Sequence, residues 1–109
     1  MKDIPFPQAV EIERMILGAI LIERDMHDVA IPQLKADYFY NSDNAKLFDR
    51  IKKMYKKGIA IDIMTVAEEC KNLKNIDAYF VASLTERIIS SGNIETHIHI
   101  LLERYMSPV

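Results

Sequence analysis

The chain has 109 residues, of which 50% are hydrophobic and 28% are charged, a composition typical of one soluble globular domain. Its 14 basic and 16 acidic residues give a formal net charge of -2, which argues against a dedicated nucleic-acid binder. The single cysteine, Cys70, excludes an internal disulfide and a thiolate zinc site, so a reducing cytoplasm is the expected compartment. The longest apolar run, Met15 to Ile22, is too short to span a bilayer, and no membrane association is expected.

Glycine is scarce, and this bears on nucleotide binding. Gly18, Gly58 and Gly92 are too far apart to form a P-loop or a dinucleotide-binding loop, both of which need glycines only a few residues apart. We therefore expect no nucleotide or cofactor site, and no catalytic residues, in this chain.

Apolar residues recur at helical spacing along the chain, and no segment alternates for long enough to indicate a strand. A first helix is predicted from near Pro7 to about Glu23. It is apolar on most sides, which indicates a central, largely buried helix. Gly18 within it predicts close approach of a neighbouring backbone.

A short second helix is predicted from Asp25 to Leu34, capped by Asp25 or Asp28, with Pro32 either in its first turn or at a break. In the polar connection that follows, Phe39 and Tyr40 are predicted to insert into the core.

A third helix is predicted to begin at the N-cap Ser42 and to end at Gly58, a residue suited to a left-handed C-terminal position. Asp62 and Asp77 are predicted to start a fourth and a fifth helix. The residues of these three helices that are expected to face inward are Leu47, Phe48, Ile51, Met54, Tyr55, Ile63, Val66, Ala67, Cys70, Phe80, Val81, Leu84 and Ile88.

A turn at residues 90–93 precedes a last helix, which Ser107-Pro108 should end or bend. This helix carries a long apolar stripe, made by Ile94, Ile98, Leu101, Leu102 and Tyr105. Such a stripe either completes the core or contacts another subunit, and the pattern alone does not choose between the two. The predicted fold is a compact all-α bundle of about six helices.

The strongest charge feature is a cluster of five cations near the end of the third helix, namely Arg50, Lys52, Lys53, Lys56 and Lys57. One interpretation is a phosphate-contacting patch for nucleic acid. The favoured interpretation is a solvated helix face, whose cations lie at the helix end that attracts positive charge.

Other polar groups give no site. His97 and His99 lie about 200° apart around a helix and cannot share a metal, so no metal site is predicted. The paired carboxylates Glu11 and Glu13, like Glu68, Glu69 and Glu103, are expected to be exposed on helices.

A set of short motifs occurs in order along the chain: Glu11-Ile12-Glu13, Ile16-Leu17-Gly18, Ile20-Leu21, Leu34 with Phe39-Tyr40, Leu47-Phe48, Gly58 with Ile61-Asp62 and Thr65-Val66, Tyr79-Phe80 with Leu84, Asn93-Ile94 and Glu103. With this set, the chain resembles the N-terminal domain of bacterial replicative hexameric DNA helicases of the DnaB family. The chain departs from the family pattern at four places, and at one of them Asn75-Ile76-Asp77-Ala78 replaces the paired glycines usual before the fifth helix. Asn44 stands where the family often has histidine, His97-Ile98 where it often has Tyr-Ala, and Ser107-Pro108 where its helix continues.

The resemblance implies a helical head over residues 1–90, followed at residues 91–109 by the first part of a helical hairpin that pairs subunits. It implies dimers or higher oligomers, a collar that docks primase and responds to a helicase loader, and only weak contact with DNA. In the family, ATP and Mg²⁺ belong to a motor domain that lies downstream.

Overall fold

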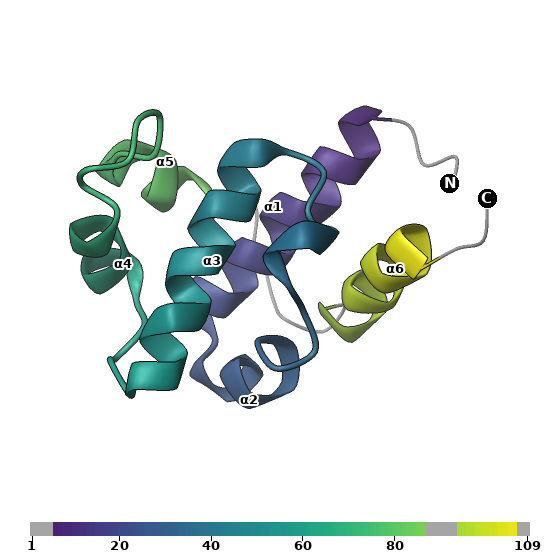
Figure 1. Ribbon diagram of the computed structural model, residues 1–109, viewed down its shortest axis with the longest axis horizontal. Helices are drawn as coiled ribbons and strands as arrows, with labels where there is room; N and C mark the ends of the chain where they lie inside the picture. Colours follow the sequence, from purple (N-terminus) through teal and green to yellow (C-terminus); the bar gives the residue numbers. More distant parts are fainter. Residues whose placement is uncertain (1–5, 87–93, 107–109) are drawn as a thin grey trace.

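The computed structural model describes residues 6–86 and 94–106. Within these ranges all regular structure is helical, which confirms the all-α prediction (Figure 1). The α-helices are α1 (Phe6–Ile22), α2 (His27–Ala30), α3 (Ser42–Lys57), α4 (Ile63–Glu69), α5 (Ala78–Ser83) and α6 (Ile94–Met106), and the 3-10 turns are η1 (Arg24–Met26) and η2 (Ala36–Tyr38). None of these helices is long and apolar enough to cross a membrane.

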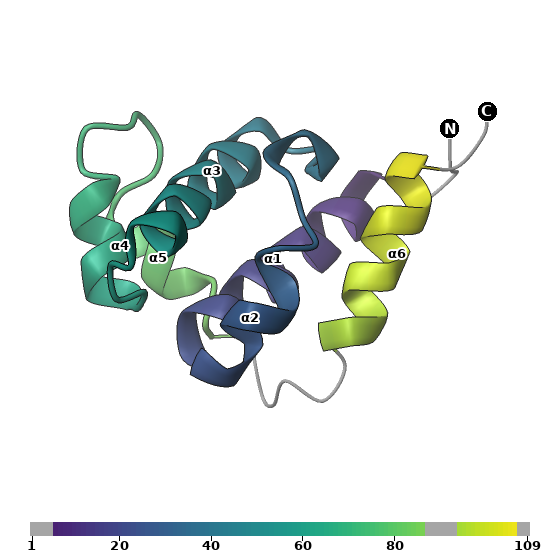
Figure 2. The same cartoon turned by 60° about the horizontal axis from the view of Figure 1, so that its bottom comes forward.

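Helix α1 lies at the centre, as its apolar sequence predicts. Ile16, Leu17 and Ile20 are fully buried, and burial extends on either side to Ala19 and Leu21, which lie about 160° apart around the helix. Figures 1 and 2 show the cause, because α3 packs across one side of α1 and α6 across another. The close approach predicted at Gly18 stays a prediction.

The single helix predicted over residues 25–34 is wrong. The segment forms η1 and the four-residue α2, and neither has a side-chain cap. Pro32 explains the early end, because it has no N–H to donate to the preceding turn, while Ile31 before it keeps helical backbone angles. Asp28, predicted as a possible cap, instead accepts a hydrogen bond from the Tyr55 hydroxyl of α3.

The two aromatics after η2 behave differently. Phe39 is buried and stacks on Phe48, with ring centroids 5.0 Å apart, as predicted. Tyr40 is 54% exposed, so its predicted insertion into the core is wrong. The chain is extended at Phe39, and successive side chains of an extended chain point in opposite directions.

Capping residues set the ends of the helices that follow. Asn41, not Ser42, is the N-cap of α3, since its side chain accepts from the Asn44 backbone N–H at 2.9 Å. Gly58 ends α3 in the left-handed region with φ 75°, as predicted. Asp62 and Asp77 cap α4 and α5 as predicted, and Asp62 forms a reciprocal capping box with Thr65.

The core combines residues from all six α-helices and from the segment between α2 and α3. Its largest fully buried side chains are Phe48, Ile16, Leu17, Ile20, Ile31, Leu34, Leu47, Ile51, Met54, Ile76, Ile98 and Leu101. Helix α6 therefore shares one core with α1, while the boundary predicted between residues 90 and 91 stays a prediction. The predictions for Ile88, the turn at 90–93 and Pro108 lie outside the described residues.

Candidate functional site

The basic cluster of α3 is used partly within the chain. Lys52 donates to the carbonyl oxygen of Leu34 at 2.5 Å, and its ammonium group lies 6.0 Å from the centroid of the Phe48 ring. Partial burial lowers the pKa of Lys52, and the nearby cations Lys56 and Lys35 lower it further. Lys52 thus ties the segment after α2 to α3.

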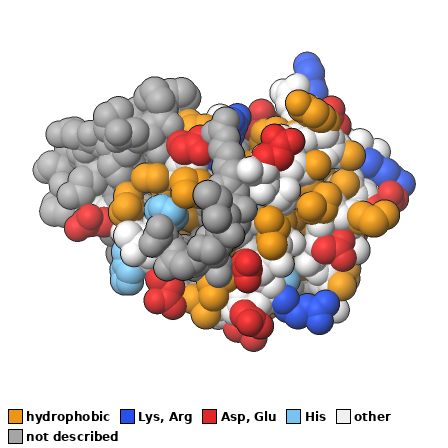
Figure 3. Space-filling view, turned by 180° about the vertical axis from the view of Figure 1, so that it is seen from behind, with side chains coloured by type: hydrophobic (Ala, Val, Ile, Leu, Met, Phe, Trp, Pro, Cys, Tyr) orange, Lys and Arg blue, Asp and Glu red, His pale blue; other side chains and the backbone are white. Residues whose placement is uncertain are grey.

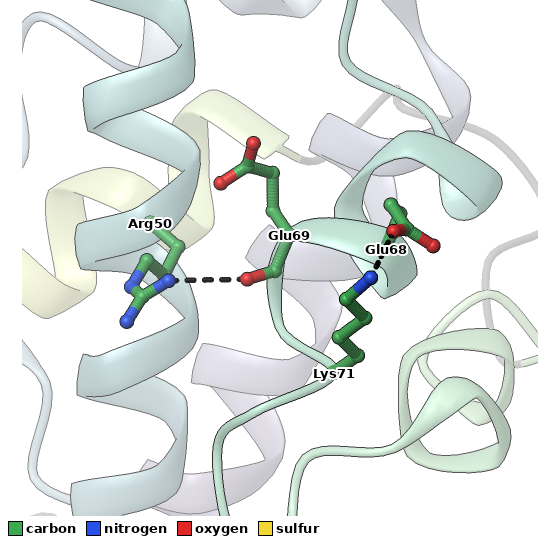
Figure 4. A network of polar contacts seen from close by, with 4 residues as sticks. All are labelled: Arg50, Glu68, Glu69 and Lys71. Atoms are coloured by element: carbon green, nitrogen blue, oxygen red, sulfur yellow. Dashed lines mark hydrogen bonds and ion pairs between the residues drawn. The ribbon is translucent and has the colours of Figure 1, made fainter.

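Arg50 and Lys53 also have partners in the chain. The Arg50 guanidinium donates to the carbonyl oxygen of Glu69 at 3.1 Å, so a cation lies at the C-terminal end of α4 (Figure 4). The C-terminal end of a helix favours positive charge, and the guanidinium also satisfies a carbonyl that α4 leaves unpaired. Lys53 forms an exposed ion pair with Asp49 at 3.1 Å.

The remaining cations of the cluster, Lys56 and Lys57, are exposed. Lys57 borders a small cavity on the surface between α3 and α4. The residues that line this cavity are Arg50, Lys53, Met54, Lys57, Ile59 and Glu69. Three of the five cations therefore contact other groups of the chain, and the surface beside them contains one small cavity.

The apolar stripe of α6 points largely inward. Ile98 and Leu101 are each 1% exposed in the core, and Leu102 is partly buried against it. Of the two alternatives left open by the sequence, core completion therefore holds for Ile98 and Leu101. The side chains of Ile94 and Tyr105 lie outside the described residues.

The opposite side of α6 carries a shallow groove, which we call the outer groove. It is lined by Thr96, His99, Ile100, Leu102 and Glu103. Four of these residues follow the i, i+3, i+4, i+7 spacing of one helix face. The groove faces away from Ile98 and Leu101, so it offers a mixed apolar and polar surface that the core does not use.

A metal site or a reactive side chain would be a further kind of functional site among the described residues. The described part of the chain holds no group of three or more histidine, cysteine, aspartate or glutamate side chains that could bind a metal ion. His27 donates from Nε2 to the carbonyl oxygen of Ile20 at 2.7 Å, near the end of α1. Burial raises the pKa of the Cys70 thiol, which disfavours the reactive thiolate.

One buried polar cluster is missing from the sequence predictions. Glu13 is fully buried, so the expectation that it is exposed is wrong. Its carboxylate accepts from the backbone N–H groups of Tyr40 at 2.5 Å and Asn41 at 3.2 Å, and from the side-chain amide of Asn44 at 3.0 Å. A buried carboxylate is tolerated where hydrogen bonds compensate its lost hydration.

A signal for this burial is present in the sequence. Glu13 precedes Ile16, Leu17 and Ile20 by three, four and seven residues, so it lies on the same face as fully buried residues. A carboxylate in the middle of an apolar face is a candidate for a buried, hydrogen-bonded group. Here it fixes the start of α3 onto α1.

Comparison with known proteins identifies the family. A family model described as the DnaB-like helicase N terminal domain matches residues 5–103, which is nearly the whole chain. The chain belongs to the DnaB family. Within the DnaB-like N-terminal domain, Glu13 of the opening motif and Asn44, a position of departure, contact each other directly.

Similar curated proteins support the same assignment. The chain is 32% identical over 104 residues to the replicative DNA helicase DnaB of Rhodothermus marinus, covering 92% of this chain and 11% of that protein. It is 29% identical to the replicative DNA helicase DnaB of Treponema pallidum, covering 92% of this chain and 24% of that protein. The chain thus spans a quarter or less of the length of these relatives.

Proposed function

We propose that this DnaB-like N-terminal domain is an assembly and partner-docking module of a replicative DNA helicase and has no catalysis of its own. The observation that carries the proposal is the family match over residues 5–103, in a chain whose glycines cannot form a P-loop. ATP and Mg²⁺ would then be bound by a motor domain of the whole protein, which works in the cytoplasm.

The proposed contact between subunits is the outer groove of α6. Ile98 and Leu101 are buried in the core of their own chain and are not accessible to a second copy. Ile100 and Leu102 keep apolar surface beside His99 and Glu103, and a small apolar centre with a polar rim is the usual anatomy of a subunit interface. The occupant we propose is the same helix of a second copy, as the first contact in a collar.

Light scattering on the chain at rising concentration tests this contact. We expect a dimer or larger oligomer, and we expect Ile100→Asp to shift it to monomer, because a carboxylate cannot be buried there without a partner. Met64→Asp is the matched control, since Met64 is 81% exposed on α4 and lies outside the groove. A chain that stays monomeric at high concentration, or an Ile100→Asp variant that assembles normally, contradicts the proposal.

The collar would further dock primase and respond to a helicase loader, and would contact DNA only weakly. Surface-immobilised chain exposed to purified primase tests the first partner directly. We expect saturable binding that survives Met64→Asp. Absence of binding to both the monomeric and the assembled chain removes primase docking from the proposal.

The alternative function is a nucleic-acid-binding module that uses Arg50, Lys52, Lys53, Lys56 and Lys57. The internal contacts of Arg50, Lys52 and Lys53 weigh against it, because cations used in this way contribute less to binding phosphates. Gel shifts with single-stranded and duplex DNA decide it. Tight binding that weakens steeply as salt rises would favour the alternative.

A further inference from the structure

Helix α3 carries a straight line of cations that extends beyond the basic cluster. Lys46, Arg50, Lys53 and Lys57 are separated by four, three and four residues, so they lie within one narrow face along about 16 Å of helix. We call this line the cationic stripe. Lys46 and Lys57 are exposed at its two ends, and the Lys53 side chain is 62% exposed near its middle.

The surface cavity beside α3 adjoins the stripe. It has a volume of about 120 Å³, and three members of the stripe, Arg50, Lys53 and Lys57, contribute to its wall. The apolar part of the cavity wall is formed by Met54, which is almost fully buried, and by Ile59, which follows the end of α3 and is 38% exposed.

The charges around the stripe are of mixed sign. Asp49 is paired with Lys53, Glu69 lies on the rim of the cavity and Asp43 lies one helical turn before Lys46, so four cations face three carboxylates and a net of one positive charge remains. The opposite side of the molecule, seen in Figure 3, shows both carboxylates and basic side chains among apolar ones. Helix α3 itself carries six of the 14 basic residues of the chain and two of its 16 acidic residues, although the whole chain is net negative.

These features fit a protein better than a nucleic acid. Carboxylates beside the stripe repel a continuous line of phosphates, and none of the residues lining this described cavity is an aromatic on which a base could stack. Lys46 and Lys57 are the members of the stripe for which the described residues show no internal contact, so a helix with carboxylates at matching spacing would meet these two first. An apolar pocket beside charged groups is also how short helical segments are recognised.

We propose that the cationic stripe and its cavity dock an acidic helical segment of another protein, with one apolar side chain of that segment in the cavity between α3 and α4. The site lies on a different helix from the outer groove of α6, so the proposal does not depend on assembly through that groove. Electrostatic attraction would speed the encounter, and the apolar side chain would fix the register.

A designed peptide tests the proposal on the whole 109-residue chain. The probe is a fluorescent helical peptide with glutamates at i, i+4, i+7 and i+11 and a leucine between them, followed by fluorescence anisotropy. We expect saturable binding that weakens by about tenfold in Lys46→Glu/Lys57→Glu and in Ile59→Asp, because the first reverses charge and the second makes the cavity polar.

The matched control is Arg24→Glu/Lys74→Glu, which makes the same change in net charge at two exposed cations that lie outside α3. We expect it to change affinity by less than about twofold at physiological salt, where distant charges are screened. Equal loss in the control and stripe variants overturns the proposal, as does a peptide that shows no saturable binding. Tighter binding of an oligothymidine probe than of the peptide also overturns it, in favour of nucleic acid.

Discussion

At the scale of single residues, the buried carboxylate of Glu13 is the feature most specific to this fold. Three donors converge on it from the segment between η2 and the first turn of α3. One side chain thus satisfies two backbone N–H groups that precede a helix and holds them against the central helix. The cluster also gives the Glu11-Ile12-Glu13 motif a physical reason, since its second carboxylate positions α3.

Replacing Glu13 by alanine should therefore be strongly destabilising. The substitution leaves the N–H groups of Tyr40 and Asn41 and the amide of Asn44 without this acceptor, and we expect a loss of about 3 kcal/mol in the free energy of unfolding. Urea denaturation followed by circular dichroism measures it. Glu69→Ala, at an exposed position of α4, should change stability by less than about 0.5 kcal/mol. Equal effects of the two substitutions would contradict the role given to Glu13.

The contact between Tyr55 and Asp28 predicts a dependence on alkaline pH. The hydrogen bond from the Tyr55 hydroxyl to Asp28 raises the pKa of Tyr55, and desolvation and the charge of Asp28 act in the same direction. Because the folded state favours the neutral phenol, the stabilisation is complete below the ordinary tyrosine pKa. It is lost as pH rises through the raised value.

Tyrosinate absorbance during a pH titration should show a step from Tyr55 that lies above the ordinary tyrosine pKa. In Asp28→Ala this late step should move to lower pH, since the acceptor and its charge are removed. Tyr55→Phe identifies the residue, because the late step should then disappear. An unchanged titration in Asp28→Ala would show that the contact does not form in solution.

At the scale of elements, helix boundaries follow from a few local groups. Asp62 and Asp77 accept hydrogen bonds from backbone N–H groups three residues on, at 2.8 Å in each case. Gly58 reverses the chain after α3 and places Ile59 beside the cationic stripe. Where such groups are absent, as in η1 and α2, the helical pieces are short and are held by contacts with α1 and α3.

A substitution at Gly58 tests whether such a local group sets the end of α3. An added Cβ would meet nothing within 4 Å, so any cost of Gly58→Ala comes from its left-handed backbone alone. We expect a loss of about 1 kcal/mol for Gly58→Ala and less for Gly58→Asn, because asparagine tolerates this conformation better. Thermal unfolding of the two variants measures the difference. Alanine proving as stable as asparagine would argue against the left-handed end of α3.

At the scale of the whole molecule, α6 is part of the same core as α1. It packs against α1, as Figure 2 shows. This packing buries Ile98 and Leu101, while the residues of the outer groove lie on the other side of α6. In the proposed docking role, a partner at the groove would therefore bind a helix that belongs to the core of the head.

Leu101→Ala tests this packing. Removing a fully buried leucine should cost about 3 kcal/mol of unfolding free energy, through lost burial and the cavity that remains. The cost should not depend on protein concentration, because the contacts are within one chain. Met64→Ala, which truncates a side chain that is 81% exposed, should be nearly neutral. A loss that grows on dilution would instead place Leu101 at a subunit contact.

The sequence by itself determined the helical class, the end of α3 at Gly58 and the caps at Asp62 and Asp77, because these depend on residues a few positions apart. Only the tertiary structure decided which way Tyr40 points, that Glu13 is buried and that Ile98 and Leu101 complete the core. It also separated the cations that bind neighbouring carbonyls from those left at the surface. These outcomes depend on partners up to dozens of residues away, and the free energy of an apolar or charged side chain is set by the groups that surround it after folding.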